Sequence, residues 1–140
     1  MKRDKYNDVV WWMWMIFLIC TIMFGYYATA QTPREIYEEC KLQNVKYPKI
    51  VTAQSIQETG WYKSYNCTKR NNLFGLRYNH KYKVFNHWKE SVTYYRDHIQ
   101  NRYKNGENYY DFLDRIGYAS DSLYNQKIRS IVRKYSINWE

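Results

Sequence analysis

Apolar residues follow two different patterns along the 140-residue chain. Residues 9–25 (VVWWMWMIFLICTIMFG) form an almost unbroken apolar run, whereas later apolar residues recur three or four positions apart. Spacing of three and four places side chains on one face of a helix, so the second pattern predicts amphipathic helices around a core. We expect these helices over residues 33–44, 49–59, 89–103, 109–116 and 122–135.

Local signals support these boundaries. Thr32-Pro33-Arg34-Glu35 offers a capping threonine, a proline at the first helical position and a glutamate three residues after the cap. Gly60 ends the second helix, and residues 76–78 and 82–85 flank Asn79-His80-Lys81 as a short hairpin would. The sequence therefore predicts a mainly α domain with one short β-hairpin over residues 31–140.

The first 30 residues have the composition of a leader. A charged start (MKRDKYND) precedes the apolar run, and Ala28-Thr29-Ala30 is a small-x-small triplet that signal peptidase cuts. We interpret residues 1–30 as a signal peptide that leaves Gln31 as the new N-terminus. The alternative is an uncleaved membrane anchor through residues 9–27, because the run reaches the lower limit of a membrane span. Either interpretation places the domain in the periplasm or cell envelope, free or anchored in the inner membrane.

Charge and aromatic content limit the kinds of binding partner that the domain is expected to have. The chain carries 22 Lys and Arg against 13 Asp and Glu, with 17 Tyr and 6 Trp. A basic surface suits an anionic polymer, and aromatic rings suit sugar faces. Since an exported protein seldom meets nucleic acid, we expect no nucleic-acid partner and favour cell-wall glycan strands.

Two cysteines, Cys40 and Cys67, remain beyond the leader. In an oxidising compartment an even pair predicts a disulfide that stabilises a small domain. The alternative is two buried free thiols. His80, His87 and His98 do not share metal-ligand spacing on a common face, so we expect no metal.

Four motifs in order carry a family resemblance. They are Val51-Thr52-Ala53-Gln54-Ser55-Ile56-Gln57-Glu58-Thr59-Gly60-Trp61, then Asn71-Asn72-Leu73-Phe74-Gly75-Leu76, then Phe85 with Ser91 and Tyr95, and finally Gly117-Tyr118-Ala119-Ser120-Asp121 with Tyr124 and Lys127-Ile128. Over residues 34–137 the chain resembles the glucosaminidase family of cell-wall hydrolases, of the mannosyl-glycoprotein endo-β-N-acetylglucosaminidase-like type. The resemblance implies a lysozyme-like domain that hydrolyses the N-acetylglucosaminyl β-1,4 linkage of peptidoglycan. We expect the domain to be a monomer that uses no cofactor.

The resemblance assigns the general acid to Glu58. A glycosidic oxygen leaves poorly until it is protonated, so this acid must keep its proton near neutral pH. Burial against Trp61 and Phe74 would raise the pKa of Glu58, and the negative end of the preceding helix acts in the same direction. A carboxylate in the last turn of a helix destabilises the helix, but the same position suits a catalytic acid that must stay protonated.

Further site residues follow from the same resemblance. Tyr118 matches a family tyrosine near the scissile bond, and Asn72, Leu73 and Phe74 match a turn that shapes the groove floor. Independently of the resemblance, the aromatic residues that are candidates for stacking on sugar rings are Trp61, Tyr62, Tyr78, Tyr82 and Trp88.

The second catalytic carboxylate is where the chain departs from longer family members. They place an acid in a β-lobe, but no Asp or Glu lies between Leu76 and Lys89 here. Glu90 is the nearest acid and is our candidate, although a place at a helix start explains it equally well. The remaining alternatives are help from the substrate's N-acetyl group, lytic transglycosylation, or a non-catalytic glycan-binding or envelope-assembly protein on the same fold.

Overall fold

The computed structural model describes residues 11–15 and 31–135 of the chain. The chain divides into two units, Met1–Ala30 and Gln31–Glu140. In the first unit the described residues 11–15 are helical, and the rest of the predicted leader lies outside the described part. Among the described helices, none has the length and apolar character needed to cross a bilayer.

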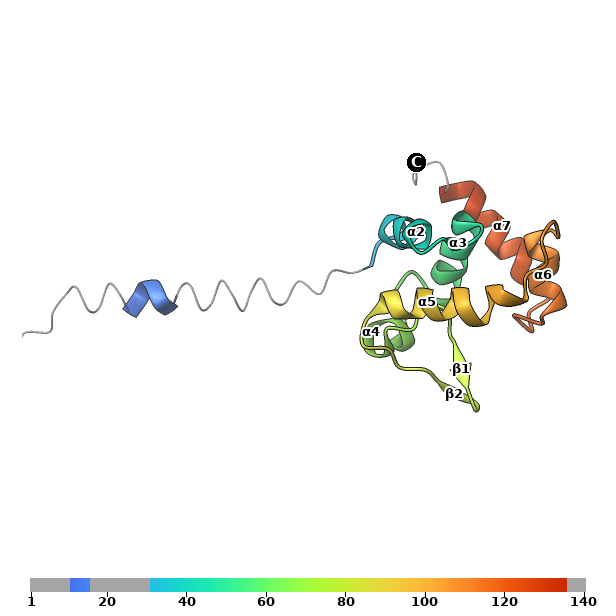
Figure 1. Ribbon diagram of the computed structural model, residues 1–140. Helices are drawn as coiled ribbons and strands as arrows, with labels where there is room; N and C mark the ends of the chain where they lie inside the picture. The colour runs from blue at the N-terminus through green and yellow to red at the C-terminus, as the bar shows by residue number, and fades with distance from the viewer. Residues whose placement is uncertain (1–10, 16–30, 136–140) are drawn as a thin grey trace, which may run out of the picture. The chain divides into compact units, whose positions relative to one another are not determined.

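The second unit is mainly helical, as predicted (Figure 1). Two short strands, β1 and β2, pair antiparallel with Arg77 opposite Tyr82, and they extend away from the helices. The elements are α2 (Pro33–Leu42), α3 (Pro48–Thr59), α4 (Tyr65–Arg70), β1 (Arg77–Tyr78), β2 (Lys81–Tyr82), α5 (Trp88–His98), the 3₁₀ turn η1 (Gln100–Arg102), α6 (Tyr109–Arg115) and α7 (Tyr124–Tyr135).

The helix termini lie where the local capping residues predict them. The backbone N–H of Glu35 donates to Thr32 Oγ1 at 3.2 Å, and the Thr32 N–H donates to Glu35 Oε2 at 2.8 Å, which completes a capping box. Helix α3 begins at Pro48 and ends at Gly60, whose φ of 55° is the left-handed conformation that glycine tolerates best.

Two elements differ from the prediction. The helix expected over residues 89–103 stops at His98, and the chain continues as η1. Helix α4 was not predicted, because the polar composition of residues 61–72 suggested irregular chain. Ser64 starts it by accepting a hydrogen bond from the Cys67 N–H at 3.3 Å, and Asn71 ends it in the left-handed conformation.

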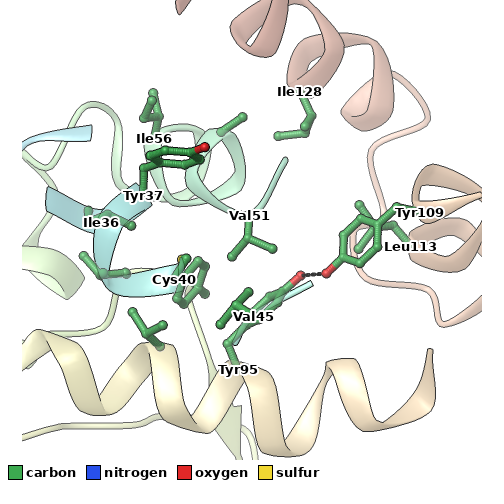
Figure 2. Close-up of a cluster of buried hydrophobic side chains, with 14 of the residues drawn as sticks. Ile36, Tyr37, Cys40, Val45, Val51, Ile56, Tyr95, Tyr109, Leu113 and Ile128 are labelled. Carbon is green, nitrogen blue, oxygen red and sulfur yellow. Dashed lines mark hydrogen bonds between the residues drawn. The ribbon is translucent and has the colours of Figure 1, made fainter. Parts of the chain in front are cut away.

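The core forms around α3, which packs against α2 and α7. Six consecutive α3 residues, 51–56, are buried, so this helix is covered on all sides rather than on one face. Figure 2 shows Val51 and Ile56 of α3 among side chains from the neighbouring helices, with the hydroxyls of Tyr95 and Tyr109 hydrogen-bonded at 2.9 Å. The core is therefore rich in tyrosine, and its buried hydroxyls need partners inside the protein.

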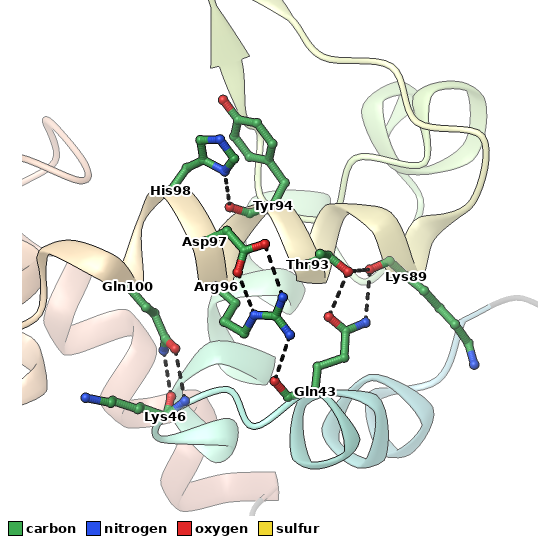
Figure 3. Close-up of polar contacts among 9 residues, drawn as sticks. All are labelled: Gln43, Lys46, Lys89, Thr93, Tyr94, Arg96, Asp97, His98 and Gln100. Atoms are coloured by element: carbon green, nitrogen blue, oxygen red, sulfur yellow. Dashed lines mark hydrogen bonds and ion pairs between the residues drawn. The ribbon is translucent and has the colours of Figure 1, made fainter.

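The chain between α2 and α3 is fastened to α5 and η1 by polar contacts (Figure 3). Arg96 donates to the Gln43 carbonyl at 3.1 Å. The Gln100 amide pairs with both backbone groups of Lys46: its Nε2 donates to the carbonyl at 2.7 Å, and its Oε1 accepts from the N–H at 2.9 Å. These bonds fix the orientation of the Gln100 side-chain amide, with Nε2 toward the Lys46 carbonyl and Oε1 toward the Lys46 N–H.

The predicted disulfide is wrong for this structure. Cys40 and Cys67 are both free and buried. Cys67 Sγ donates to Gln31 Oε1 at 3.3 Å, and Cys40 lies beside Thr52. Burial raises the pKa of the Cys40 thiol to about 12 and that of Cys67 to about 11, so both stay protonated at neutral pH.

Candidate active site

A cavity of about 610 Å³ opens beside the C-terminal end of α3. Its walls come from α3, the turn that leads into β1, the hairpin, η1 and the segment that enters α7. The lining residues are Gln57, Glu58, Asn66, Phe74, Gly75, Leu76, Arg77, Tyr82, Ile99, Arg102, Ile116, Gly117, Tyr118, Ala119, Ser120, Asp121 and Tyr124.

Glu58 lies in the last turn of α3 and is half-buried in this cavity. The chain at Gly75 approaches its carboxyl group closely, since a Cβ on Gly75 would lie 3.3 Å from Glu58 Oε2. Gly75 also has φ +60°, which L side chains rarely adopt. A glycine at this position therefore lets the turn from Asn72 to Gly75 form one wall beside the acid.

Burial raises the pKa of Glu58 above its ordinary value of 4.5, because a carboxylate loses hydration in a partly closed site. A hydrogen-bonding interaction with the Tyr124 hydroxyl opposes that rise by stabilising the charged form. The C-terminal end of α3 adds its own preference for a neutral group. Glu58 is thus held toward its protonated form in contact with an open cavity.

Tyr118 lines the same cavity. Its hydroxyl donates to the Phe74 carbonyl at 3.3 Å, and the nearby Glu58 charge helps to keep the pKa of Tyr118 high, after burial as the main cause. The tyrosine therefore joins the α7 side of the cavity to the Gly75 side, with its hydroxyl in the neighbourhood of the acid.

The turn residues predicted for the groove floor separate into two groups. Phe74 lines the cavity, whereas Leu73 is fully buried in the core. Asn72 is also fully buried, and its side chain bonds Leu76 N at 2.9 Å, Leu76 O at 2.8 Å and Lys83 O at 3.0 Å. Asn72 thus holds the turn against the hairpin.

Most of the rings predicted to stack on sugars lie elsewhere. Trp61 packs edge-on against Tyr135, Tyr62 bonds Ser55 through its hydroxyl, and Tyr78 is exposed on the hairpin. Trp88 lines a separate cavity of about 460 Å³ with residues of α2. Of these rings only Tyr82 lines the Glu58 cavity.

The structure does not bring Glu90 to Glu58. Glu90 is exposed at the start of α5, where its Oε2 accepts from the Asn86 N–H at 3.2 Å. The carboxylates among the described lining residues are Glu58 and Asp121. Asp121 accepts from Lys127 Nζ at 2.6 Å and from the Leu123 N–H at 2.9 Å, and these two bonds, the first being stronger, lower its pKa.

Several lining residues escaped the sequence analysis as site residues. Asp121 belongs to the fourth motif but was given no role in the site, Arg77 was expected only as one of several basic residues around the groove, and Arg102 had no motif to mark it. Arg77 lies with its guanidinium 4.2 Å from the Tyr82 ring centroid, so a cationic and aromatic pair borders the cavity. Within residues 11–15 and 31–135, no cluster of three or more His, Cys, Asp and Glu is arranged to hold a metal ion.

A half-buried carboxyl group with a raised pKa beside an open cavity is typical of an enzyme active site. Residues 34–137 match the model of the glucosaminidase family, described as mannosyl-glycoprotein endo-beta-N-acetylglucosaminidase, and the chain belongs to this family. The domain is thus a glycan hydrolase at the level of its family. No curated protein and no solved structure was found to match the chain.

Proposed function

We propose that this protein is an exported endo-β-N-acetylglucosaminidase that cleaves the N-acetylglucosaminyl β-1,4 linkage of peptidoglycan on a lysozyme-like domain, with Glu58 as general acid. The observation that carries the proposal is the half-buried Glu58 carboxyl, with its raised pKa, in a cavity of about 610 Å³. A cavity of that volume is within the range of ligand sites, roughly 300–1,000 Å³.

The bond-breaking step follows from the position of the acid. Glu58 gives its proton to the glycosidic oxygen while the bond from that oxygen to the anomeric carbon breaks, so the leaving sugar departs as a neutral alcohol. Glu58 is left as a carboxylate beside the cavity. It can then accept a proton from the water that completes hydrolysis.

A single free carboxylate supports assistance by the substrate. Asp121, the other carboxylate among the described lining residues, is already bonded to Lys127 and to the Leu123 backbone. The acetamido oxygen of the sugar would attack the anomeric carbon and form a cyclic oxazolinium ion, which water then opens. Tyr118, which lines the same cavity, would border the positive charge that develops.

Two guanidinium groups favour an anionic glycan as the substrate. Arg77 and Arg102 both line the cavity and are exposed. Neither forms an ion pair with a carboxylate among the described residues. Their charges are therefore available to the acidic stem peptides of peptidoglycan.

The same lone carboxylate favours one second candidate, a lytic transglycosylase. In that reaction a hydroxyl of the cleaved sugar takes the place of water, and the product carries an anhydro end. Mass spectrometry of the fragments released from peptidoglycan separates the two reactions, because an anhydro end is one water lighter than a reducing end.

The test compares three forms of the full chain by zymography on cell-wall substrate and by fragment analysis. We expect lysis by the native chain, no lysis by Glu58→Gln, and lysis by Glu90→Gln as the matched control on a glutamate outside the cavity. Lysis by Glu58→Gln would overturn the proposal. Glycan binding without lysis by the native chain would instead support the non-catalytic alternative.

A further inference from the structure

The buried tyrosines and glutamines of the core form one continuous hydrogen-bonded chain. It runs from the Lys46 backbone through Gln100, Tyr109, Tyr95 and Gln54 to Tyr124, and Tyr124 lines the same cavity as Glu58. All five side chains are buried, and they come from η1, α6, α5, α3 and α7. We refer to these five residues as the core chain.

The direction of every bond in the core chain is fixed at its far end. The Lys46 N–H can only donate and the Lys46 carbonyl can only accept, so Gln100 must present Oε1 to the first and Nε2 to the second, at 2.9 and 2.7 Å. The second Nε2 hydrogen then points to the Tyr109 hydroxyl at 2.7 Å. Tyr109 is thereby an acceptor from Gln100.

The remaining bonds follow one from another. Because Tyr109 accepts from Gln100, its own hydrogen goes to the Tyr95 hydroxyl at 2.9 Å. Tyr95 then donates to Gln54 Oε1 at 2.7 Å. This leaves Gln54 Nε2 facing the Tyr124 hydroxyl at 3.2 Å.

Tyr124 is the last member. Because its oxygen accepts from Gln54, its hydrogen is available to Glu58, and the interaction between the two lowers the pKa of Glu58 and raises that of Tyr124, as a bond donated to a carboxylate does. From Gln100 to Tyr124, every hydrogen bond between members of the core chain is therefore donated in the same direction, toward the acid.

We infer that the core chain is a positioning device, which aims one hydrogen at Glu58 and thereby stabilises the carboxylate that forms as Glu58 gives up its proton. The inference rests on the proposed function. No proton travels along the core chain, since each hydrogen stays on its own atom. The donor is already oriented before reaction, so its stabilisation needs no rearrangement in the transition state.

Tyr124→Phe removes the last donor and keeps the ring. We expect kcat on peptidoglycan to fall on the order of tenfold with little change in KM, because a hydrogen bond to a charged group is lost. The alkaline limb of the pH profile should move to higher pH. NMR titration of the Glu58 side-chain carboxyl carbon should show the same upward move of its pKa.

Gln100→Met tests the far end without adding a charge. It removes the group that fixes the direction of the bonds, so we expect the pKa of Glu58 and kcat to change in the same directions as in Tyr124→Phe, but less. Tyr110→Phe is the matched control, since Tyr110 is a half-buried tyrosine outside the core chain. It should behave as the native protein.

The groups around Glu58 must be followed in the same titration. The ionisable side chains that line its cavity are Arg77, Tyr82, Arg102, Tyr118, Asp121 and Tyr124. Of these, Asp121 titrates in the acidic range, and its lowered pKa separates its step from that of Glu58.

Two results overturn the inference: an unchanged pKa of Glu58 in folded Tyr124→Phe, or a Gln100→Met protein that titrates like Tyr110→Phe. Thermal melting of each variant verifies folding, and if Tyr124→Phe does not fold, Gln100→Met decides. The NMR titration needs no activity. If Glu58→Gln kept the activity of the native protein, the proposed role of Glu58 as the acid would be refuted. The NMR titration would still test whether the core chain changes the pKa of Glu58.

Discussion

The backbone of Gly75 faces the Glu58 carboxyl so closely that a Cβ on Gly75 would lie 3.3 Å from Glu58 Oε2. Residues 17 positions apart in the chain thus build one wall of the cavity together. The contact explains why the turn before β1 ends in a residue without a side chain. It also makes Gly75 a sensitive test of the site.

Gly75→Ala should lower activity more than it lowers stability. The new methyl group crowds Glu58, and the positive φ adds a backbone cost of about 1 kcal/mol. Thermal melting and kcat measure the two effects. Gly60→Ala is the matched control, because Gly60 has φ +55° with open space around its Cβ position. Equal activity loss in both variants would contradict a specific contact with the acid.

Activity should fall as pH rises through the raised pKa of Glu58, because only the protonated acid can give up a proton. The contribution of Glu58 to the stability of the fold also falls as pH rises. The folded state binds this proton more tightly than the unfolded state, so its contribution is complete below about pH 4.5 and is lost as pH rises through the folded pKa.

Glu58→Gln removes the loss of stability that the ionisation of Glu58 causes at high pH. We expect the variant to melt at a higher temperature than the native protein at pH 8 and at a similar temperature at pH 4. Melting curves at the two pH values measure the difference. A native protein that gains stability relative to Glu58→Gln as the pH rises would show that Glu58 is not held toward its neutral form.

Cys40 and Cys67 should react with alkylating reagents only after unfolding. Both thiols are buried and their pKa values are raised, so neither supplies much thiolate to a reagent in the folded state. Peptide mass spectrometry after alkylation with and without denaturant, both without reductant, measures this. A linked peptide that contains both cysteines would contradict the free-thiol structure.

Asn72→Ala should destabilise the domain by about 2 to 3 kcal/mol, because the backbone groups of the turn lose buried partners. Asn105→Ala is the control, since Asn105 is exposed and, among the described residues, accepts a hydrogen bond from the Lys46 ammonium at the surface. Chemical denaturation of both variants gives the comparison. A loss no larger at Asn72 than at Asn105 would mean that the turn does not depend on Asn72.

The elements of the fold were predictable where the signal is local. Thr32, Pro33 and Gly60 mark helix ends through contacts with their own neighbours in sequence, and they do so in the structure. Helix α4 was missed because it is only six residues long and has no apolar period. Its start depends on the single hydroxyl of Ser64.

The candidate site was predictable only through its motifs. Glu58, Phe74 and Asp121 lie in recognisable segments, whereas Arg102 lies in η1, outside every motif, and reaches the cavity only through the packing of the fold. The exposed tryptophan Trp61 shows the limit of composition: it follows Glu58 closely in sequence but turns to Tyr135 instead of the cavity. The disulfide was inferred from the expected compartment, which carries no information on where each thiol points.

The role of Glu58 as an acid is tested most directly by changing the leaving group. The native chain and Glu58→Gln should be compared on peptidoglycan and on a dinitrophenyl glycoside of an N-acetylglucosamine oligomer, whose leaving group needs no proton. We expect Glu58→Gln to lose about 10²- to 10⁴-fold in kcat on peptidoglycan and to stay close to the native rate on the dinitrophenyl substrate. Equal losses on the two substrates, or no loss on peptidoglycan, would contradict the assignment of Glu58 as the general acid.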